Sequence, residues 1–229
     1  MTKIKHISFD LWMTLIKSNP TFKSERAKYF FDFHNSQSKS ISEISQIIRE
    51  IDLMCNEINE INGNSISSEE MYLMVLFKIN GKLEDYDSKS ILRIYNEINE
   101  IFEKYNPSLF DSNTIIVLEN LKRKNYSMSL LSNTAFLKGI SLVSVLQKLN
   151  IIDFFHFLFF SDQYNLSKPN QKYFSKTFEE IKNKINLNKA EIIHVGDNYK
   201  ADYLGSKLFG YQPILINSND KSILELNNL

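Results

Sequence analysis

Two apolar segments of this chain end in carboxylates although they lie far apart in the sequence. The first ends at Asp10, and Thr14 follows four residues later. The second ends at Asp197, and Asp202 follows five residues later. If both segments are strands of one parallel sheet, their ends meet at the edge where such sheets bind ligands. Carboxylates gathered there would form an acidic pocket suited to a divalent cation such as Mg²⁺.

Asp10 is placed to act as a nucleophile. A carboxylate at the end of a buried strand can be aimed at a substrate without rearrangement, which nucleophilic catalysis requires. On its own, such a residue is more simply explained as the cap of the following turn. Thr14 and the distant pair Gly196 and Asp197 favour the catalytic interpretation, and glycine permits a close approach of the backbone at the strand exit.

Two further polar segments lie between these acidic ends. Ser132 and Asn133 follow an apolar strand expected at residues 127–131. A hydroxyl and successive backbone N–H groups at a strand end can hold phosphoryl oxygens. Lys168 precedes Pro169 in a loop, which on its own is typical of a solvated turn.

Helices and short apolar strands alternate around these four segments. We expect strands at residues 3–9, 127–131, 157–160, 192–195 and 214–216, and helices at residues 111–124, 137–149, 171–185 and 200–209. This alternation is typical of an α/β fold with a doubly wound parallel sheet covered on both faces. All four polar segments then fall at the carboxyl ends of strands.

The segment from residue 18 to residue 106 has helical periodicity and almost no strand signal. Isoleucines recur at spacings of three and four around residues 44–51, and residues 69–79 and 88–105 follow the same pattern. We therefore expect an all-helical cap domain at 18–106, inserted into an α/β core domain made of 1–17 and 107–229. An insert directly after the Asp10 strand can close over the pocket and exclude water.

The four polar segments, in this order, resemble the four motifs of the haloacid dehalogenase-like (HAD) hydrolase superfamily. The resemblance covers the chain outside the insert and implies a Rossmann-like HAD core of a phosphatase-like branch with a helical cap. It implies that Asp10 is the nucleophile and that Mg²⁺ is held by Asp10, the backbone oxygen of Trp12 and Asp197. It also implies that Lys168 contacts nucleophile and phosphate, and that Asp202 binds the metal through water or holds its neighbours in place.

Trp12 departs from the family pattern. Most family phosphatases have a second aspartate at this position, which protonates the leaving oxygen and then activates water. Such acid–base help is worth about 10² to 10⁴ in rate, and indole cannot supply it. Met13 also replaces the usual glycine and would narrow the pocket entrance. Glu25 or His34 of the insert is a candidate substitute for the missing acid.

Three functions remain open at this point. We expect a Mg²⁺-dependent phosphohydrolase that acts on a small phosphorylated metabolite through an aspartyl phosphate on Asp10. The dehalogenase branch of the family also has an aromatic residue at position 12 and needs no metal, but Asp197 would repel an anionic haloacid. The third alternative is a pseudoenzyme that binds phosphate or metal without turnover.

The insert also carries candidate substrate-binding residues. Lys23 and Arg26 share one face of a helix just beyond the hinge and could hold a second anionic group, or they could form a solvated basic face. Trp12 could stack on a planar substrate or fill space. The four histidines have no metal-ligand spacing, and we expect His156 and His194 to pack in the core or in strands.

Composition excludes several other classes. Lys plus Arg and Asp plus Glu number 27 each, so no overall charge favours a nucleic acid or an anionic membrane as partner. Cys55 is the single cysteine, which excludes an internal disulfide and a cysteine-based zinc site and suggests a buried helix position. No apolar run could span a bilayer and no signal peptide precedes the first strand, so we expect a cytoplasmic location.

Overall fold

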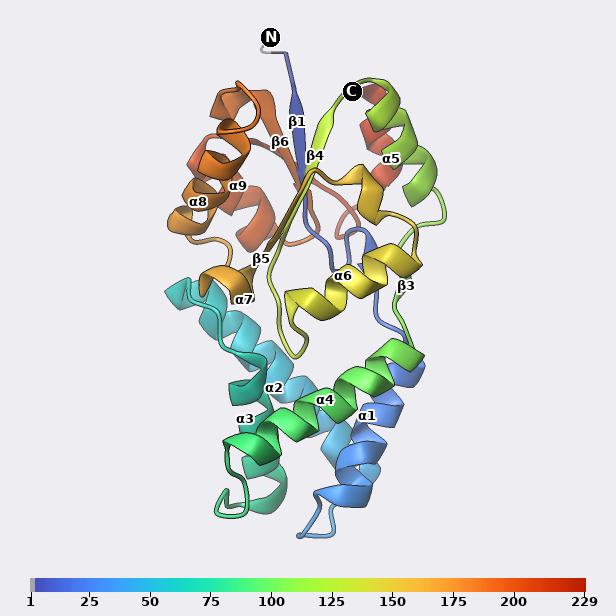
Figure 1. Cartoon of the computed structure of the whole chain (residues 1–229), viewed down its shortest axis with the longest axis vertical. Coiled ribbons are helices and arrows are strands. Elements are labelled where there is room, and N and C mark those ends of the chain that lie inside the picture. The colour runs from blue at the N-terminus through green and yellow to red at the C-terminus, as the bar shows by residue number, and fades with distance from the viewer. Residues whose placement is uncertain (1–2) are drawn as a thin grey trace.

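The computed structural model describes residues 3–229 and has two parts, a sheet with helices on both faces and a helical region below it (Figure 1). The sheet is parallel throughout, with the strand order β5-β4-β1-β6-β7. Its strands are β1 (His6–Phe9), β4 (Ser127–Ser132), β5 (Phe157–Phe160), β6 (Ile192–Gly196) and β7 (Gln212–Leu215). The expected α/β class is confirmed.

The register of β1 brings the expected polar segments to one edge of the sheet. Phe9 lies opposite Leu130 of β4 on one side and opposite Val195 of β6 on the other. All three strands run in the same direction, so their carboxyl ends stop at nearly the same level. The residues that follow these ends are therefore neighbours in space.

Helices cover both faces of the sheet, and each face has its own apolar core. Along β4, Leu130 packs in the larger core while Leu131 packs in the smaller one, because successive strand residues point to opposite faces. Against the sheet, the larger core includes α5 (Thr114–Arg123), α6 (Gly139–Lys148) and η4 (Ile223–Asn228), and it continues into the inserted helical region. The smaller core includes α8 (Gln171–Lys182) and α9 (Gly205–Phe209).

One expected helix differs from the structure. The helix predicted at 200–209 begins instead as a π-helical turn, η3 (Tyr199–Leu204), before α9. The remaining short elements are η1 (Ile152–Phe154), α7 (Ser161–Tyr164) and η2 (Lys189–Glu191).

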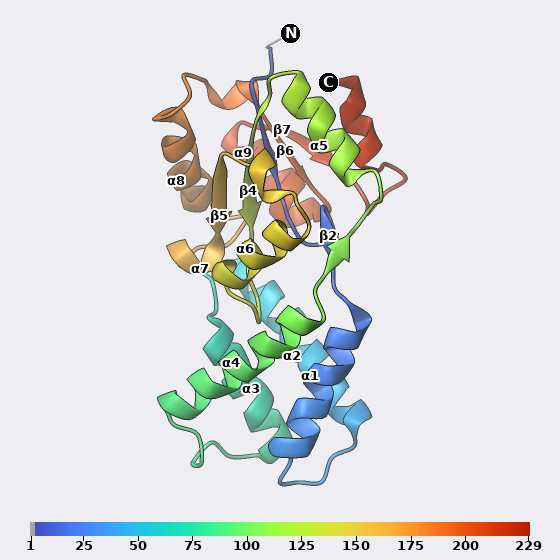
Figure 2. The same ribbon diagram turned by 45° about the vertical axis from the view of Figure 1, so that its right-hand side comes forward.

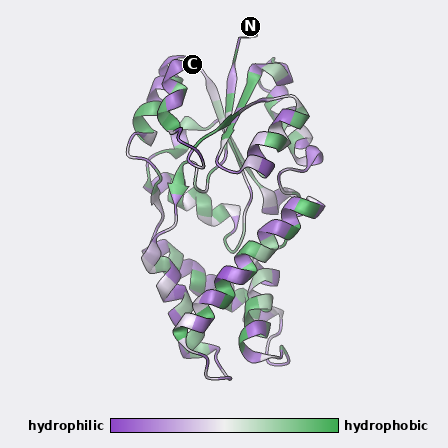
Figure 3. Ribbon diagram, turned by 180° about the vertical axis from the view of Figure 1, so that it is seen from behind, coloured by the Kyte–Doolittle hydropathy of each residue, from purple (hydrophilic) through white to green (hydrophobic). Residues whose placement is uncertain are grey.

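Four helices form the region inserted after β1, as expected. They are α1 (Pro20–Phe33), α2 (Ile41–Asn62), α3 (Ser68–Asn80) and α4 (Ser88–Lys104). Each starts at a residue whose side chain accepts a hydrogen bond from the first turn, namely Asn19, Ser40, Ser67 and Asp87. Hydrophobic and hydrophilic residues alternate along these helices (Figure 3), as expected where one face packs in a core.

A small second sheet joins the two parts and was not expected from the sequence. The chain leaves the large sheet through β2 (Ile16–Lys17) and returns through β3 (Ser108–Leu109), and the two strands pair antiparallel. Figure 2 shows both crossing segments side by side between the sheet and the helical region. Strands of two residues are too short for a periodic signal.

Helix α2 also reaches the sheet part at its far end. It has 22 residues and so extends about 33 Å. It ends at Gly63, whose φ of 74° lies in the left-handed region. The Gly63 carbonyl accepts hydrogen bonds from Ser167 N at 3.0 Å and Asn170 Nδ2 at 2.9 Å, on both sides of Lys168 and Pro169.

Across residues 3–229, no helix combines the length and the apolar character that a membrane span requires. Cys55 is fully buried in α2, as predicted.

Gly63→Ala should destabilise the protein more than Gly81→Ala. Both glycines end a helix with φ of 74°, so each alanine adds a left-handed strain of about 1 kcal/mol. A Cβ at Gly63 would also lie 2.5 Å from Asn170 Nδ2, whereas one at Gly81 meets only the end of the Gln37 side chain. We expect losses of about 2 to 3 kcal/mol and about 1 kcal/mol in urea unfolding, respectively. Equal losses would contradict the close packing at Gly63.

Candidate active site

Three aspartates meet at the carboxyl edge of the sheet. Asp10 follows β1, Asp197 follows β6, and Asp202 lies in η3. One carboxylate oxygen from each lies within 4.8 Å of the others. The two acidic strand ends therefore converge, as the sequence predicted. We refer to these three residues as the acidic cluster.

The Lys168 side chain connects two members of the acidic cluster. Its Nζ atom donates to Asp10 Oδ1 at 2.8 Å and to Asp202 Oδ1 at 2.6 Å. Lys168 is only 1% exposed. Burial alone would lower the pKa of Lys168, but the two carboxylates raise it, so the side chain stays an ammonium.

The acidic cluster holds more negative charge than Lys168 compensates. Burial raises the pKa of Asp10 to about 7, with Asp202 and Asp197 adding to the rise and Lys168 opposing it. Burial and the charge of Asp202 raise the pKa of Asp197 to about 6. Burial would raise the pKa of Asp202 as well, but Lys168 and His194 hold it well below its usual range.

Two buried side chains fix the orientation of the acidic cluster. The Thr14 hydroxyl lies 3.1 Å from Asp10 Oδ2 and 3.4 Å from Asp197 Oδ1, so it donates to one of these carboxylates. His194 Nε2 lies 3.2 Å from Asp202 Oδ1, and its Nδ1 lies 3.0 Å from the Ser8 hydroxyl. A ring protonated at Nε2 satisfies both contacts, because Nε2 then donates to Asp202 and Nδ1 accepts from Ser8.

Gly196 makes room for this arrangement. A Cβ at this position would overlap the Asp202 carboxylate, so only glycine allows the aspartate to fold back against the end of β6. The expected close approach at the strand exit is therefore one between the backbone and Asp202.

The donor set fits a divalent cation. Three buried carboxylates face a single ammonium, so an additional positive charge would relieve their mutual repulsion. Within residues 3–229 no donor bonds to the backbone carbonyl of Trp12, which leaves that oxygen free to act as a ligand. Mg²⁺ takes such oxygens together with water.

Ser132 and Asn133 occupy different positions around Lys168. The Asn133 side chain accepts from Lys168 N at 2.8 Å and donates to Lys168 O at 3.0 Å, so it holds the lysine loop in place. Ser132 is fully buried behind the pocket wall, and its hydroxyl lies 3.3 Å from the Asn133 carbonyl. A direct contact of either side chain with substrate stays a prediction.

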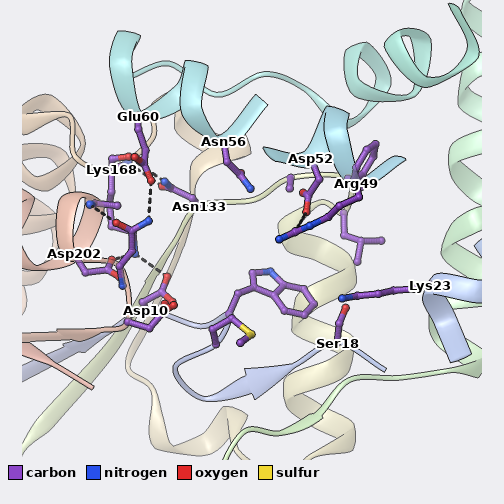
Figure 4. A pocket seen from close by; sticks show the side chains of 18 of the residues that line it. Asp10, Ser18, Lys23, Arg49, Asp52, Asn56, Glu60, Asn133, Lys168 and Asp202 are labelled. Carbon is purple, nitrogen blue, oxygen red and sulfur yellow. Dashed lines mark hydrogen bonds and ion pairs between the residues drawn. The ribbon is translucent and has the colours of Figure 1, made fainter. Parts of the chain in front are cut away.

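A pocket of about 340 Å³ lies next to the acidic cluster, between the sheet and the helical region. This volume suits a small metabolite. Figure 4 shows Asp10, Asp202, Lys168 and Asn133 on one side of the pocket and Lys23 and Arg49 on the other. Trp12 and Met13 also line the pocket.

Arg26, the second candidate substrate-binding residue of α1, also lines the pocket. Its guanidinium lies over two aromatic rings, 5.1 Å from the centroid of Phe22 and 4.6 Å from that of Phe136. Its Nε is buried without a hydrogen-bond partner among residues 3–229. An anion in the pocket would provide a partner for this guanidinium.

The two proposed substitutes for the missing acid do not reach the pocket. His34 Nε2 lies 3.1 Å from the Tyr29 hydroxyl and its Nδ1 lies 3.3 Å from the Tyr86 hydroxyl, inside the helical region. Among the residues that the structure describes, Glu25 is not one of those that line the pocket. His156 lies just before β5 and is exposed, so it does not pack in the core, but its Nδ1 accepts a hydrogen bond from Met128 N of β4 at 3.3 Å.

A polar stripe on α2, which we did not predict from the sequence, also lines the pocket. Its members recur at spacings of three and four and so lie on one face of the helix. They are Arg49, Asp52, Asn56 and Glu60. The same periodicity that indicated the helix could have identified this face.

Comparisons with known proteins agree with this architecture. Residues 7–216 match the sequence profile of a family described as haloacid dehalogenase-like hydrolase. None of the curated proteins compared with the chain matches it.

Several solved structures have the same fold. The magnesium-bound HAD-hydrolase YfnB from Bacillus subtilis has a TM-score of 0.73 at 15% identity, over 96% of this chain and 92% of that one. A predicted phosphoglycolate phosphatase from Haemophilus somnus has a TM-score of 0.67 at 17% identity, over 99% and 92%. L-2-haloacid dehalogenase from Xanthobacter autotrophicus, with chloropropionic acid covalently bound, has a TM-score of 0.60 at 16% identity, over 93% and 77%. Identities this low show a shared fold alone.

Affinity for Mg²⁺ should rise with pH. The pKa values of Asp10, about 7, and Asp197, about 6, both exceed the ordinary 3.8, so the metal-free cluster holds protons that Mg²⁺ must displace. Calorimetric titration at pH 5.5 and at pH 7.5 should show at least a tenfold tighter dissociation constant at the higher pH. Proton release, measured in two buffers of different ionisation enthalpy, should accompany binding at pH 5.5. Constant affinity without proton release would contradict the raised pKa values.

Proposed function

Because the chain belongs to the haloacid dehalogenase-like hydrolase family, we propose that it is a Mg²⁺-dependent phosphohydrolase acting on a small phosphorylated metabolite. The observation that supports this most is the buried contact of Lys168 with Asp10, next to Asp197 and Asp202. A nucleophile, a cationic partner and a set of metal ligands are together at one end of a pocket. We further propose that the helical region acts as a cap domain at 18–106 over a core made of 1–17 and 107–229.

The proposed metal ligands are Asp10, the backbone oxygen of Trp12 and Asp197, with Asp202 bound through water or bracing Lys168. When bound, Mg²⁺ offsets the repulsion between a carboxylate and a phosphate dianion, which at 4 Å is about 4 kcal/mol at an effective dielectric of 20. Fluctuation of the nucleophile is limited by Thr14 and Lys168, which both contact Asp10.

In the first step, one Asp10 oxygen attacks phosphorus while the bond from phosphorus to the substrate oxygen breaks. Asp10 then carries the phosphoryl group as an acyl phosphate. Lys168 lies within 2.8 Å of Asp10 and can neutralise charge on the equatorial phosphoryl oxygens. Backbone N–H groups after Ser132 are candidates for the same role. Water then cleaves the acyl phosphate and restores the Asp10 carboxylate.

Trp12 limits which substrates react well. Its indole cannot give a proton to the departing oxygen, so the leaving group must depart as an anion or take a proton from elsewhere. Substrates with stable leaving anions, such as acyl or aryl phosphates, need this help least. We expect alkyl phosphates to react slowly.

The basic side of the pocket favours a substrate with a second anionic group. Lys23 and Arg26 line the pocket from α1, and the buried Nε of Arg26 has no hydrogen-bond partner in the part of the chain that the structure describes. A carboxylate or a second phosphate on the substrate would fit between them and the acidic cluster. Trp12 lines the pocket, where its ring can stack on a planar group.

A haloacid dehalogenase activity is the second candidate, because Trp12 is aromatic and a halide leaves without protonation. The acidic cluster argues against it. Three carboxylates within 4.8 Å would repel the carboxylate of a haloacid unless a cation were present. Halide release from a 2-haloacid without metal would favour this candidate, and binding of phosphate or Mg²⁺ without any turnover would favour a pseudoenzyme.

Asp10→Asn should abolish metal-dependent phosphatase activity. The amide is a poor nucleophile and a weaker metal ligand, so we expect a loss of at least about 10³-fold across a panel of phosphate esters. Asp153→Asn makes the same change on the exposed surface and serves as the control. Activity that persists in Asp10→Asn, or that is unchanged when EDTA removes Mg²⁺, would contradict the proposed function.

Trp12→Asp should raise the phosphatase rate by about 10-fold or more, and most for alkyl phosphates, because it restores an acid beside the leaving oxygen. Trp12→Asn opens the same space without an acid and controls for pocket size. Steady-state rates for an alkyl and an aryl phosphate compare the variants. If both variants gain equally, the missing acid is not what limits the rate.

A further inference from the structure

The second half of the proposed reaction needs a base that Trp12 cannot provide. A water molecule must attack the phosphorus of the Asp10 acyl phosphate and lose a proton as it does so. In-line displacement requires the water to approach from the side opposite Asp10, which is the side that the first leaving group vacated. That side faces the pocket and helix α2 (Figure 4).

Helix α2 brings two carboxylates to the pocket wall, and they have different partners. Asp52 lies 3.1 Å from Arg49 Nη1, on the basic side of the pocket. Glu60 lies on the side of Lys168 and Asn133. Glu25, the acidic candidate from the sequence, is not among the described residues that line the pocket.

Hydrogen bonds connect Glu60 to the acidic cluster. Glu60 Oε1 accepts from Asn198 Nδ2 at 2.8 Å. The backbone N–H of Asn198 donates to Asp202 Oδ2 at 3.0 Å. Glu60 is thus two hydrogen bonds away from Asp202, although it comes from the helical region.

The surroundings of Glu60 keep one oxygen available. Its side chain is 19% exposed, and Oε2 forms an ion pair with Lys200 Nζ at 3.5 Å. Lys200 is half exposed, so this ion pair is weak and screened by solvent. Glu60 Oε2 can therefore accept a proton from water without breaking the hydrogen bond that orients Oε1.

We propose that Glu60 is the catalytic base that activates water for hydrolysis of the Asp10 acyl phosphate. The water O–H bond breaks as its proton moves to Glu60, the new O–P bond forms, and the bond from phosphorus to the Asp10 oxygen breaks. The products are inorganic phosphate and the Asp10 carboxylate, and Glu60 later returns its proton to solvent. This inference rests on the proposed function, because it needs the acyl phosphate.

The docking of α2 explains how a residue of the helical region can serve the core. Gly63, three residues after Glu60, is held by Ser167 and Asn170 on both sides of Lys168. The end of α2 is therefore fixed against the loop that supplies Lys168. Glu60 reaches the reacting water only when this end of α2 is docked.

The test compares Glu60→Gln with Lys200→Ala, using p-nitrophenyl phosphate with Mg²⁺ in rapid-quench experiments. Glutamine keeps an oxygen for Asn198 but cannot take a proton, whereas Lys200→Ala removes the weak ion pair and leaves the carboxylate. We expect Glu60→Gln to release nitrophenolate in a burst of about one equivalent, followed by a steady rate about 100-fold below the unmodified protein. Intact-protein mass spectrometry should find the phosphorylated form accumulated. Lys200→Ala should stay within about threefold of the unmodified protein.

The other outcomes overturn the assignment. If Glu60→Gln hydrolyses its acyl phosphate at the unmodified rate, Glu60 is not the base. If burst and steady rate fall together without accumulation, Glu60 positions the loop at Asn198 and takes no proton. If the unmodified protein forms no phosphorylated Asp10, the proposed phosphohydrolase function itself is contradicted. The first two outcomes contradict only the role of Glu60.

Discussion

The arrangement depends on one buried interaction, the ammonium of Lys168 between Asp10 and Asp202. A buried ammonium is stable only beside carboxylates, and the buried carboxylates are in turn stabilised by the ammonium. The three charged groups come from separate elements. Asp10 follows β1, Lys168 lies in the loop before α8, and Asp202 lies in η3 after β6. The parallel register of the sheet and the folded-back position of Asp202 against Gly196 are therefore conditions for the same charge balance.

Much of this could be predicted from the sequence. An apolar run that ends in a carboxylate indicates a buried strand and a polar edge, and parallel strands bring such edges together. The meeting of Asp10 and Asp197 followed from that reasoning together with Thr14 and Gly196, whereas their proposed roles came from the family resemblance. The inserted helices followed from periodicity, and the structure adds start signals such as Ser40 with Glu43, which form a reciprocal pair of hydrogen bonds. Strand ends were right to within a few residues because short apolar runs bounded by polar residues define them.

The parts that could not be predicted depend on how separate elements dock. Periodicity can place Glu60 on a polar face of α2, but only the position of α2 over the sheet turns that face toward the pocket. His194 was expected to be simple packing, yet its Nε2 meets Asp202 because η3 folds back over β6. The pairing of β2 with β3 involves two residues on each side, a length at which local sequence holds no signal.

That short pairing has an evolutionary consequence. The chain leaves the sheet through β2 and returns through the paired strand β3, so the residues between them form an insertion that can change as a unit. Lengthening, shortening or swapping this stretch would leave β1 aligned with β4 and β6, since none of their hydrogen bonds passes through it. Changes in this stretch would remodel the pocket wall that α1 and α2 supply, while Asp10, Lys168 and Asp197 stay in place at the sheet edge.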